Sequence, residues 1–124
     1  MVAVSVQPTE HELQKSIVVY LTHALPKDAV FFAVPNGGDR NPIVASKLKA
    51  EGVKPGVPDL LILWRGQTFG LEVKTLKGRV SVAQELFHEK ARRAGMFVEV
   101  VRSLSDVSRY LEARGVPLGA RVNG

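Results

Sequence analysis

Hydrophobic residues recur at helical spacing near the start of the chain. This segment follows the start signal Pro8-Thr9, and its apolar residues fall on one helical face: Leu13, Ile17, Tyr20, Leu21 and Ala24. This predicts a helix over 10–24, and further helices are expected at 43–51, 81–94 and 105–114. Gly52 and Gly95 follow the second and third of these and are typical end signals.

Short apolar or alternating runs between these helices predict four strands. They lie at 30–34, 59–64, 68–75 and 96–101, with a turn at Arg65-Gly66 joining the middle two. The expected order of elements is therefore α-β-(insert)-β-β-α-β-α. At 124 residues the chain is expected to form one α/β or α+β domain, 1–124, with an insert at 35–55 and a loose tail at 115–124.

Three charged residues interrupt the pattern of the two middle strands. Because strand side chains alternate, Glu72 and Lys74 share one face of the strand, opposite the apolar face. A two-residue turn at Arg65-Gly66 would place Asp59 opposite Glu72, with Cβ atoms ~4.5–5.5 Å apart. Two carboxylates are then expected to lie side by side at the end of the hairpin.

Opposed like charges destabilise a sheet by ~0.2–1 kcal/mol, so this pair predicts a bound divalent cation. Oxygen ligands favour Mg²⁺ or Mn²⁺. Lys74, ~7 Å along the strand from Glu72, could orient a water or stabilise charge on a phosphate. The alternative is structural: Asp59 begins a strand after proline, and Glu72 and Lys74 form an exposed polar edge.

The helices contribute further candidates. Thr9-x-x-Glu12 has capping-box spacing, which leaves Glu10 freer to reach the cation; the alternative for Glu10 is a solvated acid in the first turn. Ser81-x-x-Gln84 also matches a capping box, so Gln84 is either a cap or a site residue. On that helix we expect His88 to be partly exposed, and the buried side to be formed by Leu86, Phe87 and Ala94.

Composition and charge narrow the function classes. The chain has no cysteine, which excludes disulfides and thiolate chemistry, and its N-terminus resembles no signal peptide, so a cytoplasmic, non-membrane protein is expected. The net charge is +5, and residues 39–93 contain 11 Lys and Arg against 6 Asp and Glu. This basic stretch favours a polyanion such as nucleic acid, the alternative being a solvated face. Candidate contacts are Lys77 and Arg79, and Asn36 and Arg40 in the loop PNGGDR.

The combination of GVPDLLIL at 56–63, GLEVK at 70–74 and a downstream Gln84 resembles the virus-type replication-repair nucleases (VRR-NUC) of the PD-(D/E)xK superfamily. The resemblance covers most of the chain. It implies a restriction-endonuclease-like α-β-β-β-α-β core, a central mixed sheet flanked by helices, and metal-dependent hydrolysis of DNA phosphodiesters.

By this resemblance Asp59, Glu72 and the Val73 carbonyl would bind Mg²⁺ or Mn²⁺, and Lys74 would assist the attacking water. Glu10 would supply the helix acid, with Glu12 and Gln14 as competitors, and Gln84 would be the glutamine after the core strands. The implied substrate is branched DNA such as a Holliday junction or flap. The resemblance also implies a homodimer, encoded by a bacterium or phage, that acts in replication and repair. The rival hypothesis is a non-catalytic nucleic-acid-binding module with the same fold.

Overall fold

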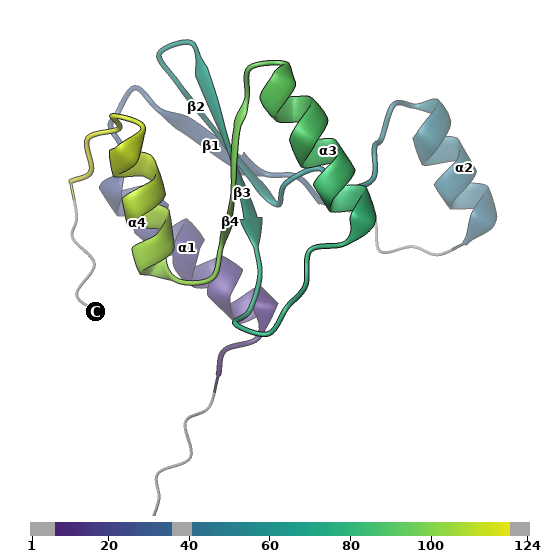
Figure 1. Cartoon of the computed structure of the whole chain (residues 1–124), viewed down its shortest axis with the longest axis horizontal. Coiled ribbons are helices and arrows are strands. Elements are labelled where there is room, and N and C mark those ends of the chain that lie inside the picture. The colour runs from purple at the N-terminus through teal and green to yellow at the C-terminus, as the bar shows by residue number, and fades with distance from the viewer. Residues whose placement is uncertain (1–6, 36–40, 120–124) are drawn as a thin grey trace, which may run out of the picture.

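Four strands and four helices form the described part of the chain, residues 7–35 and 41–119 of a computed structural model (Figure 1). The elements are α1 (Glu10–Ala24), β1 (Val30–Ala33), α2 (Pro42–Ala50), β2 (Leu60–Trp64), β3 (Gln67–Val73), α3 (Val82–Arg93), β4 (Phe97–Val101) and α4 (Leu104–Ala113). The predicted order is confirmed, and the ends differ from the prediction by only a few residues.

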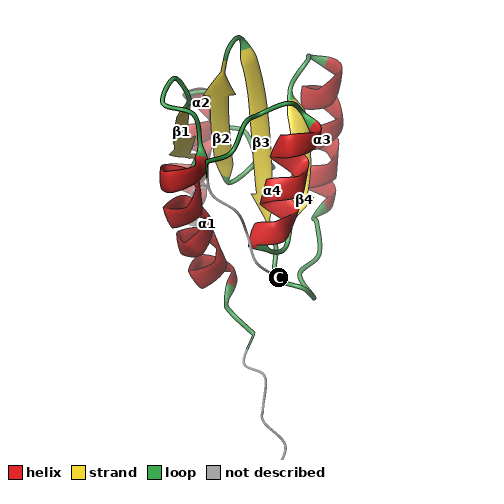
Figure 2. Ribbon diagram, turned by 90° about the vertical axis from the view of Figure 1, so that its left-hand side faces the viewer, coloured by secondary structure: helices red, strands yellow, loops and turns green. Residues whose placement is uncertain are grey.

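The strands form one mixed sheet in the order β1-β2-β3-β4. The β1–β2 and β2–β3 pairs are antiparallel, whereas β3 and β4 run parallel because α3 connects them across the sheet. Helices α1 and α4 cover one face of this sheet, and α3 lies toward the other side beside β4 (Figure 2). The sheet is therefore flanked by helices, as expected.

The hydrophobic core lies between the sheet and the pair α1 and α4. It contains the inward-facing residues of β2 and β3 together with one stripe of each helix, all with no exposed surface: Ile17, Leu21, Leu60, Ile62, Phe69, Leu71, Val73, Val107 and Leu111. Burying each such side chain stabilises the fold by about 1.5–3 kcal/mol. This core holds β3 rigidly, and β3 carries Glu72 on its other face.

The hairpin between β2 and β3 turns at two residues with positive φ, Arg65 at 46° and Gly66 at 77°. These angles belong to the type I′ turn, whose twist matches that of the strands. The resulting register pairs Trp64 with Gln67 and ends where Leu60 pairs with Leu71. The predicted register is confirmed, but Asp59 lies just beyond β2 rather than inside it.

The expected burial along α3 was wrong. Leu86 is 59% exposed and Ala94 is exposed, so they do not form the buried side of α3; His88 is the residue of this helix that is buried. The reason is that α3 covers a polar part of the sheet. In the segment after α4, Val116 is buried and the Gly119 N–H donates to the Ala24 carbonyl at 2.8 Å.

Helix α2 stands away from the sheet and contains no buried residue (Figure 1). It begins at an asparagine cap, Asn41, whose side chain accepts from the Ile43 N–H at 2.9 Å. Within residues 7–35 and 41–119, no helix is long and apolar enough to cross a membrane.

Candidate active site

Gly70 and Pro58 place Asp59 beside β3. A Cβ atom on Gly70 would lie 2.9 Å from Pro58 Cγ, so the proline packs on β3 only because residue 70 has no side chain. The next residue, Asp59, accepts a hydrogen bond through Oδ2 from the Val73 N–H at 2.8 Å. The Asp59 carbonyl also accepts from the Val34 N–H at 2.9 Å. Asp59 is thus held at the end of three strands.

A second glycine attaches this loop to α3. Gly56 has a φ of +85°, and a Cβ atom there would lie 2.4 Å from the Ala83 carbonyl oxygen. This close approach brings the segment that ends in Asp59 against the first turn of α3. The loop and the helix therefore have a fixed relative position.

Glu72 and Lys74 are both buried, with exposed fractions of 0% and 8%. The alternative of an exposed polar edge is therefore wrong. Burial raises the pKa of Glu72 to about 9, and the hydrogen bond and the charge of neighbouring Asp59 add to this effect. Lys74 lowers the pKa of Glu72 but does not outweigh the other effects. Without a cation, Glu72 therefore keeps its proton at neutral pH.

Gln84 serves both as a cap and as a partner of Glu72. Its N–H donates to Ser81 Oγ at 3.1 Å, and its Oε1 accepts from the Ser81 N–H at 2.9 Å, which completes the capping box. The amide nitrogen Nε2 remains available and lies 3.3 Å from Glu72 Oε2. The two interpretations of Gln84 are compatible, because they use different atoms of one side chain.

His88, which the sequence predicts to be partly exposed, lies in the site. It is 2% exposed, and its Nε2 lies 3.1 Å from Glu72 Oε1. Burial, followed by the charges of Arg92 and Lys74, lowers the pKa of His88. The available signal was its spacing, since residues four apart share one face of a helix and His88 follows Gln84 by four.

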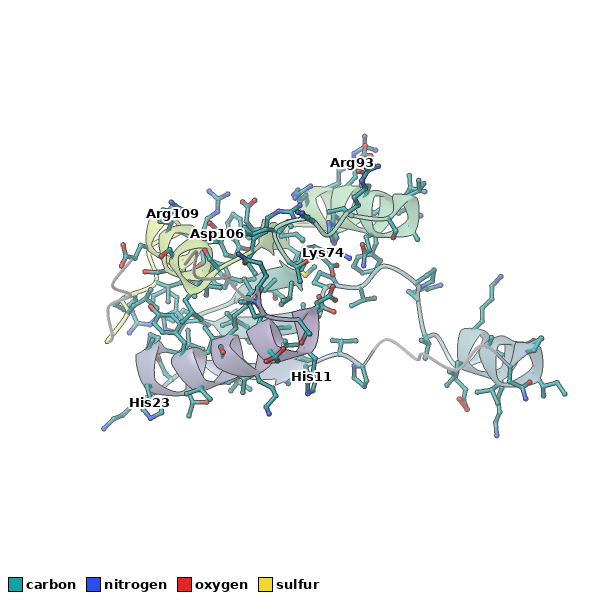
Figure 3. All side chains as sticks on the ribbon, turned by 90° about the horizontal axis from the view of Figure 1, so that it is seen from below. His11, His23, Lys74, Arg93, Asp106 and Arg109 are labelled. Carbon is teal, nitrogen blue, oxygen red and sulfur yellow. The ribbon has the colours of Figure 1, made fainter. Side chains whose placement is uncertain are left out.

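The N-terminus of α1 lies near the same carboxylates. Glu12 is committed to the capping box, with Thr9 Oγ1 accepting from its N–H and the Thr9 N–H donating to its Oε1, both at 3.1 Å. The charge of Glu10 raises the pKa of Glu72, so Glu10 acts electrostatically on the site. Figure 3 shows Lys74 between the ribbons of α1 and α3.

The donor set fits a hard divalent cation held mainly by two carboxylates. Among residues 7–35 and 41–119 there is no preformed cluster of three or more His, Cys, Asp or Glu side chains able to hold a metal. What the site offers is two adjacent carboxylates, one of them fully buried and reluctant to ionise. A cation between them would remove their mutual repulsion.

Comparison with known proteins identifies the family. The VRR-NUC domain matches residues 9–104, which is most of the chain. The chain belongs to the VRR-NUC family. A solved structure described as a VRR_NUC domain protein is 24% identical, covers 86% of this chain and 91% of its own, and superposes with a TM-score of 0.69. No curated protein matches significantly. The resemblance and the restriction-endonuclease-like α/β fold are thereby confirmed.

In this VRR-NUC chain, the loop that leaves the site is fixed by Arg102. Its Nη1 donates to the carbonyl oxygens of Thr75 at 2.6 Å, Gly78 at 2.8 Å and Leu76 at 3.3 Å. The loop carries Lys77 and Arg79, which are both exposed. Asn36 and Arg40, the other candidate DNA contacts, lie outside the described residues.

Proposed function

We propose that this VRR-NUC chain is a metal-dependent DNA endonuclease in which Asp59, Glu72 and the Val73 carbonyl bind Mg²⁺ or Mn²⁺. The observation that carries the proposal is the fully buried Glu72 beside Asp59, with its pKa raised to about 9. A carboxylate pair of this kind is unfavourable in the empty protein and favourable around a cation. Membership of a nuclease family, which generally uses divalent metals and acts on DNA, supports the same conclusion.

Each residue has a separate role in this proposal. A bound divalent cation would polarise the phosphodiester and make a water more nucleophilic. Lys74, buried on the face of β3 that carries Glu72, orients that water or stabilises negative charge on the phosphate. Gln84 donates to Glu72 and keeps its carboxylate in place. Glu10, whose charge acts on Glu72 from the start of α1, would supply a further carboxylate to the cation.

The substrate we propose is branched DNA, a Holliday junction or a flap, cut in replication or repair inside a bacterial or phage-infected cell. Lys77 and Arg79 lie on the loop that follows Lys74, and they would contact the DNA backbone together with Asn36 and Arg40. One chain offers one site, whereas symmetric cutting of a junction requires two. A homodimer with two-fold symmetry would supply both sites.

The decisive experiment is a cleavage assay with the purified chain on end-labelled linear, flapped and four-way junction DNA. Each substrate is tested with Mg²⁺, with Mn²⁺ and with EDTA. Cleavage of branched DNA that requires the metal is expected. Cleavage of linear duplex alone would refute the preference for branched DNA but not the nuclease activity. DNA binding without cleavage in the presence of either metal would favour the non-catalytic nucleic-acid-binding module.

A further inference from the structure

We infer that His88 is a positioning residue for Glu72, and that it acts together with Gln84 as a two-donor clamp on the metal-binding carboxylate. The inference rests on the proposed function, because it assigns Glu72 to the metal. It adds a residue that neither the motif nor the family match identifies.

The geometry of the clamp is specific. Gln84 and His88 lie one turn apart on α3 and approach different oxygens of Glu72, Oε2 at 3.3 Å and Oε1 at 3.1 Å. Two donors fixed to one helix define both the position and the plane of a carboxylate, whereas one donor leaves rotation about the remaining bond. Because Glu72 and His88 are 0% and 2% exposed, water cannot easily replace either contact.

The direction of the hydrogen bond follows from the chemistry of the metal-bound state. An ionised carboxylate can only accept, so the hydrogen on the shared bond then belongs to His88 Nε2. Each carboxylate oxygen accepts more than one partner, which leaves Glu72 able to bind a cation while it accepts from the clamp. His88 therefore does not compete with the metal.

Two other roles for His88 fit the structure less well. A direct ligand would have to turn a ring nitrogen to the cation, whereas Nε2, the nitrogen that faces the carboxylates, already contacts Glu72 at 3.1 Å. A general base would have to accept a proton, whereas in the clamp the Nε2 of His88 carries the hydrogen that it donates to Glu72.

Removing the donor should weaken metal binding. Residues that orient a metal ligand typically contribute 10–100-fold to metal affinity or activity. We expect His88→Leu, which fills the space without donating, to weaken Mn²⁺ binding by about this factor. His88→Gln places an amide nitrogen near the position of Nε2 and should recover most of the affinity. His88→Asn has a shorter side chain, so its amide should not reach Glu72 and the affinity should stay low.

The test is calorimetric titration of each full-length variant with Mn²⁺ in the absence of DNA. His23→Leu is the matched control, because His23 is exposed and lies at the far end of α1 (Figure 3). DNA affinity in EDTA, measured in parallel, should be the same in all variants. If His88→Leu does not fold, the comparison of His88→Gln with His88→Asn decides the question.

The outcomes separate this inference from the proposed function. Wild-type affinity for Mn²⁺ in His88→Leu or His88→Asn would overturn the clamp and leave the metal site standing. Equal losses in the Gln and Asn variants would also overturn it, because donation would then not be the property that matters. Failure of the wild-type chain itself to bind Mn²⁺ would overturn both.

Discussion

The carboxylate of Asp59 accepts a hydrogen bond of 2.8 Å from the backbone N–H of Val73. This bond links the residue before β2 to the last residue of β3. In a strand, the N–H and C=O of one residue point toward the same neighbour. The Val73 carbonyl is therefore directed to the side on which Asp59 lies. Two of the proposed metal donors are brought together by backbone geometry, and Glu72 is the residue immediately before Val73 in β3.

The first prediction concerns the two carboxylates. Asp59→Asn and Glu72→Gln should each abolish cleavage while leaving DNA affinity nearly unchanged, because each removes a metal ligand and neither alters a phosphate contact. Cleavage is measured on labelled junction DNA with Mn²⁺, and affinity by fluorescence anisotropy in EDTA. Full activity in either variant would eliminate the proposed site.

The second prediction concerns pH. The folded-state pKa of Glu72, about 9, exceeds its ordinary value of 4.5, so the native chain retains a proton that the unfolded chain releases. The contribution of this proton to the free energy of unfolding is fully present below pH 4.5 and is lost as the pH rises toward 9. The lowered pKa of His88 acts in the opposite direction, but only below its ordinary value of 6.5.

Above pH 6.5, the melting temperature of the metal-free wild type should therefore fall relative to that of Glu72→Gln, which does not titrate. The measurement is thermal unfolding of both proteins in EDTA from pH 6.5 to pH 9. Parallel curves would show that Glu72 is already ionised in the native state.

The third prediction compares two glycines. Gly56→Ala and Gly52→Ala both place a side chain at positive φ, which costs about 1–2 kcal/mol. A Cβ on Gly56 would also meet the Ala83 carbonyl at 2.4 Å, whereas nothing lies within 4 Å of one on Gly52. Gly56→Ala should therefore destabilise the chain more and should also reduce cleavage, because it displaces Asp59 from α3. Denaturant unfolding and cleavage of both variants test this, and equal effects would contradict it.

The fourth prediction concerns the loop held by Arg102. Each phosphate contact contributes about 0.9 to the slope of log affinity against log salt concentration. Replacing Lys77 and Arg79 with alanine should weaken DNA binding and reduce this slope by about 1.8. The cleavage rate at saturating DNA should change little. Lys27→Ala, an exposed change outside the loop, is the control, and an unaltered slope in the double variant would place the DNA elsewhere.

How far the sequence predicts the site depends on the range of the interactions. The adjacency of Asp59 and Glu72 follows from strand alternation and a two-residue turn, and both of these local features can be predicted from the sequence. The burial of His88 cannot be predicted in this way, because it depends on α3 crossing the sheet over Glu72. The exposure of Leu86 has the same cause: helical periodicity assigns apolar residues to the covered side, but the side that α3 covers is polar.

The last prediction concerns assembly. We expect the chain to form a homodimer, and light scattering of the purified protein measures this directly. The apolar face of α4 is not free for an interface, because Val107 and Leu111 have no exposed surface and belong to the chain's own core. Helix α2 is available, since Ile43 is 80% exposed, so Ile43→Glu tests its contribution.

Symmetric cutting provides the functional measurement. If two sites act together, a junction labelled on each strand in turn should be nicked at equivalent positions on opposite strands, and a mixture of wild type with Glu72→Gln should accumulate singly nicked junctions. A mixed dimer of one wild-type and one Glu72→Gln chain contains one active site. The second cut can then occur only after the junction dissociates and binds another active dimer, or after the subunits exchange. A monomer that cuts the two strands independently would give no such accumulation. That result would remove the paired mechanism while leaving the chemistry of Asp59 and Glu72 intact.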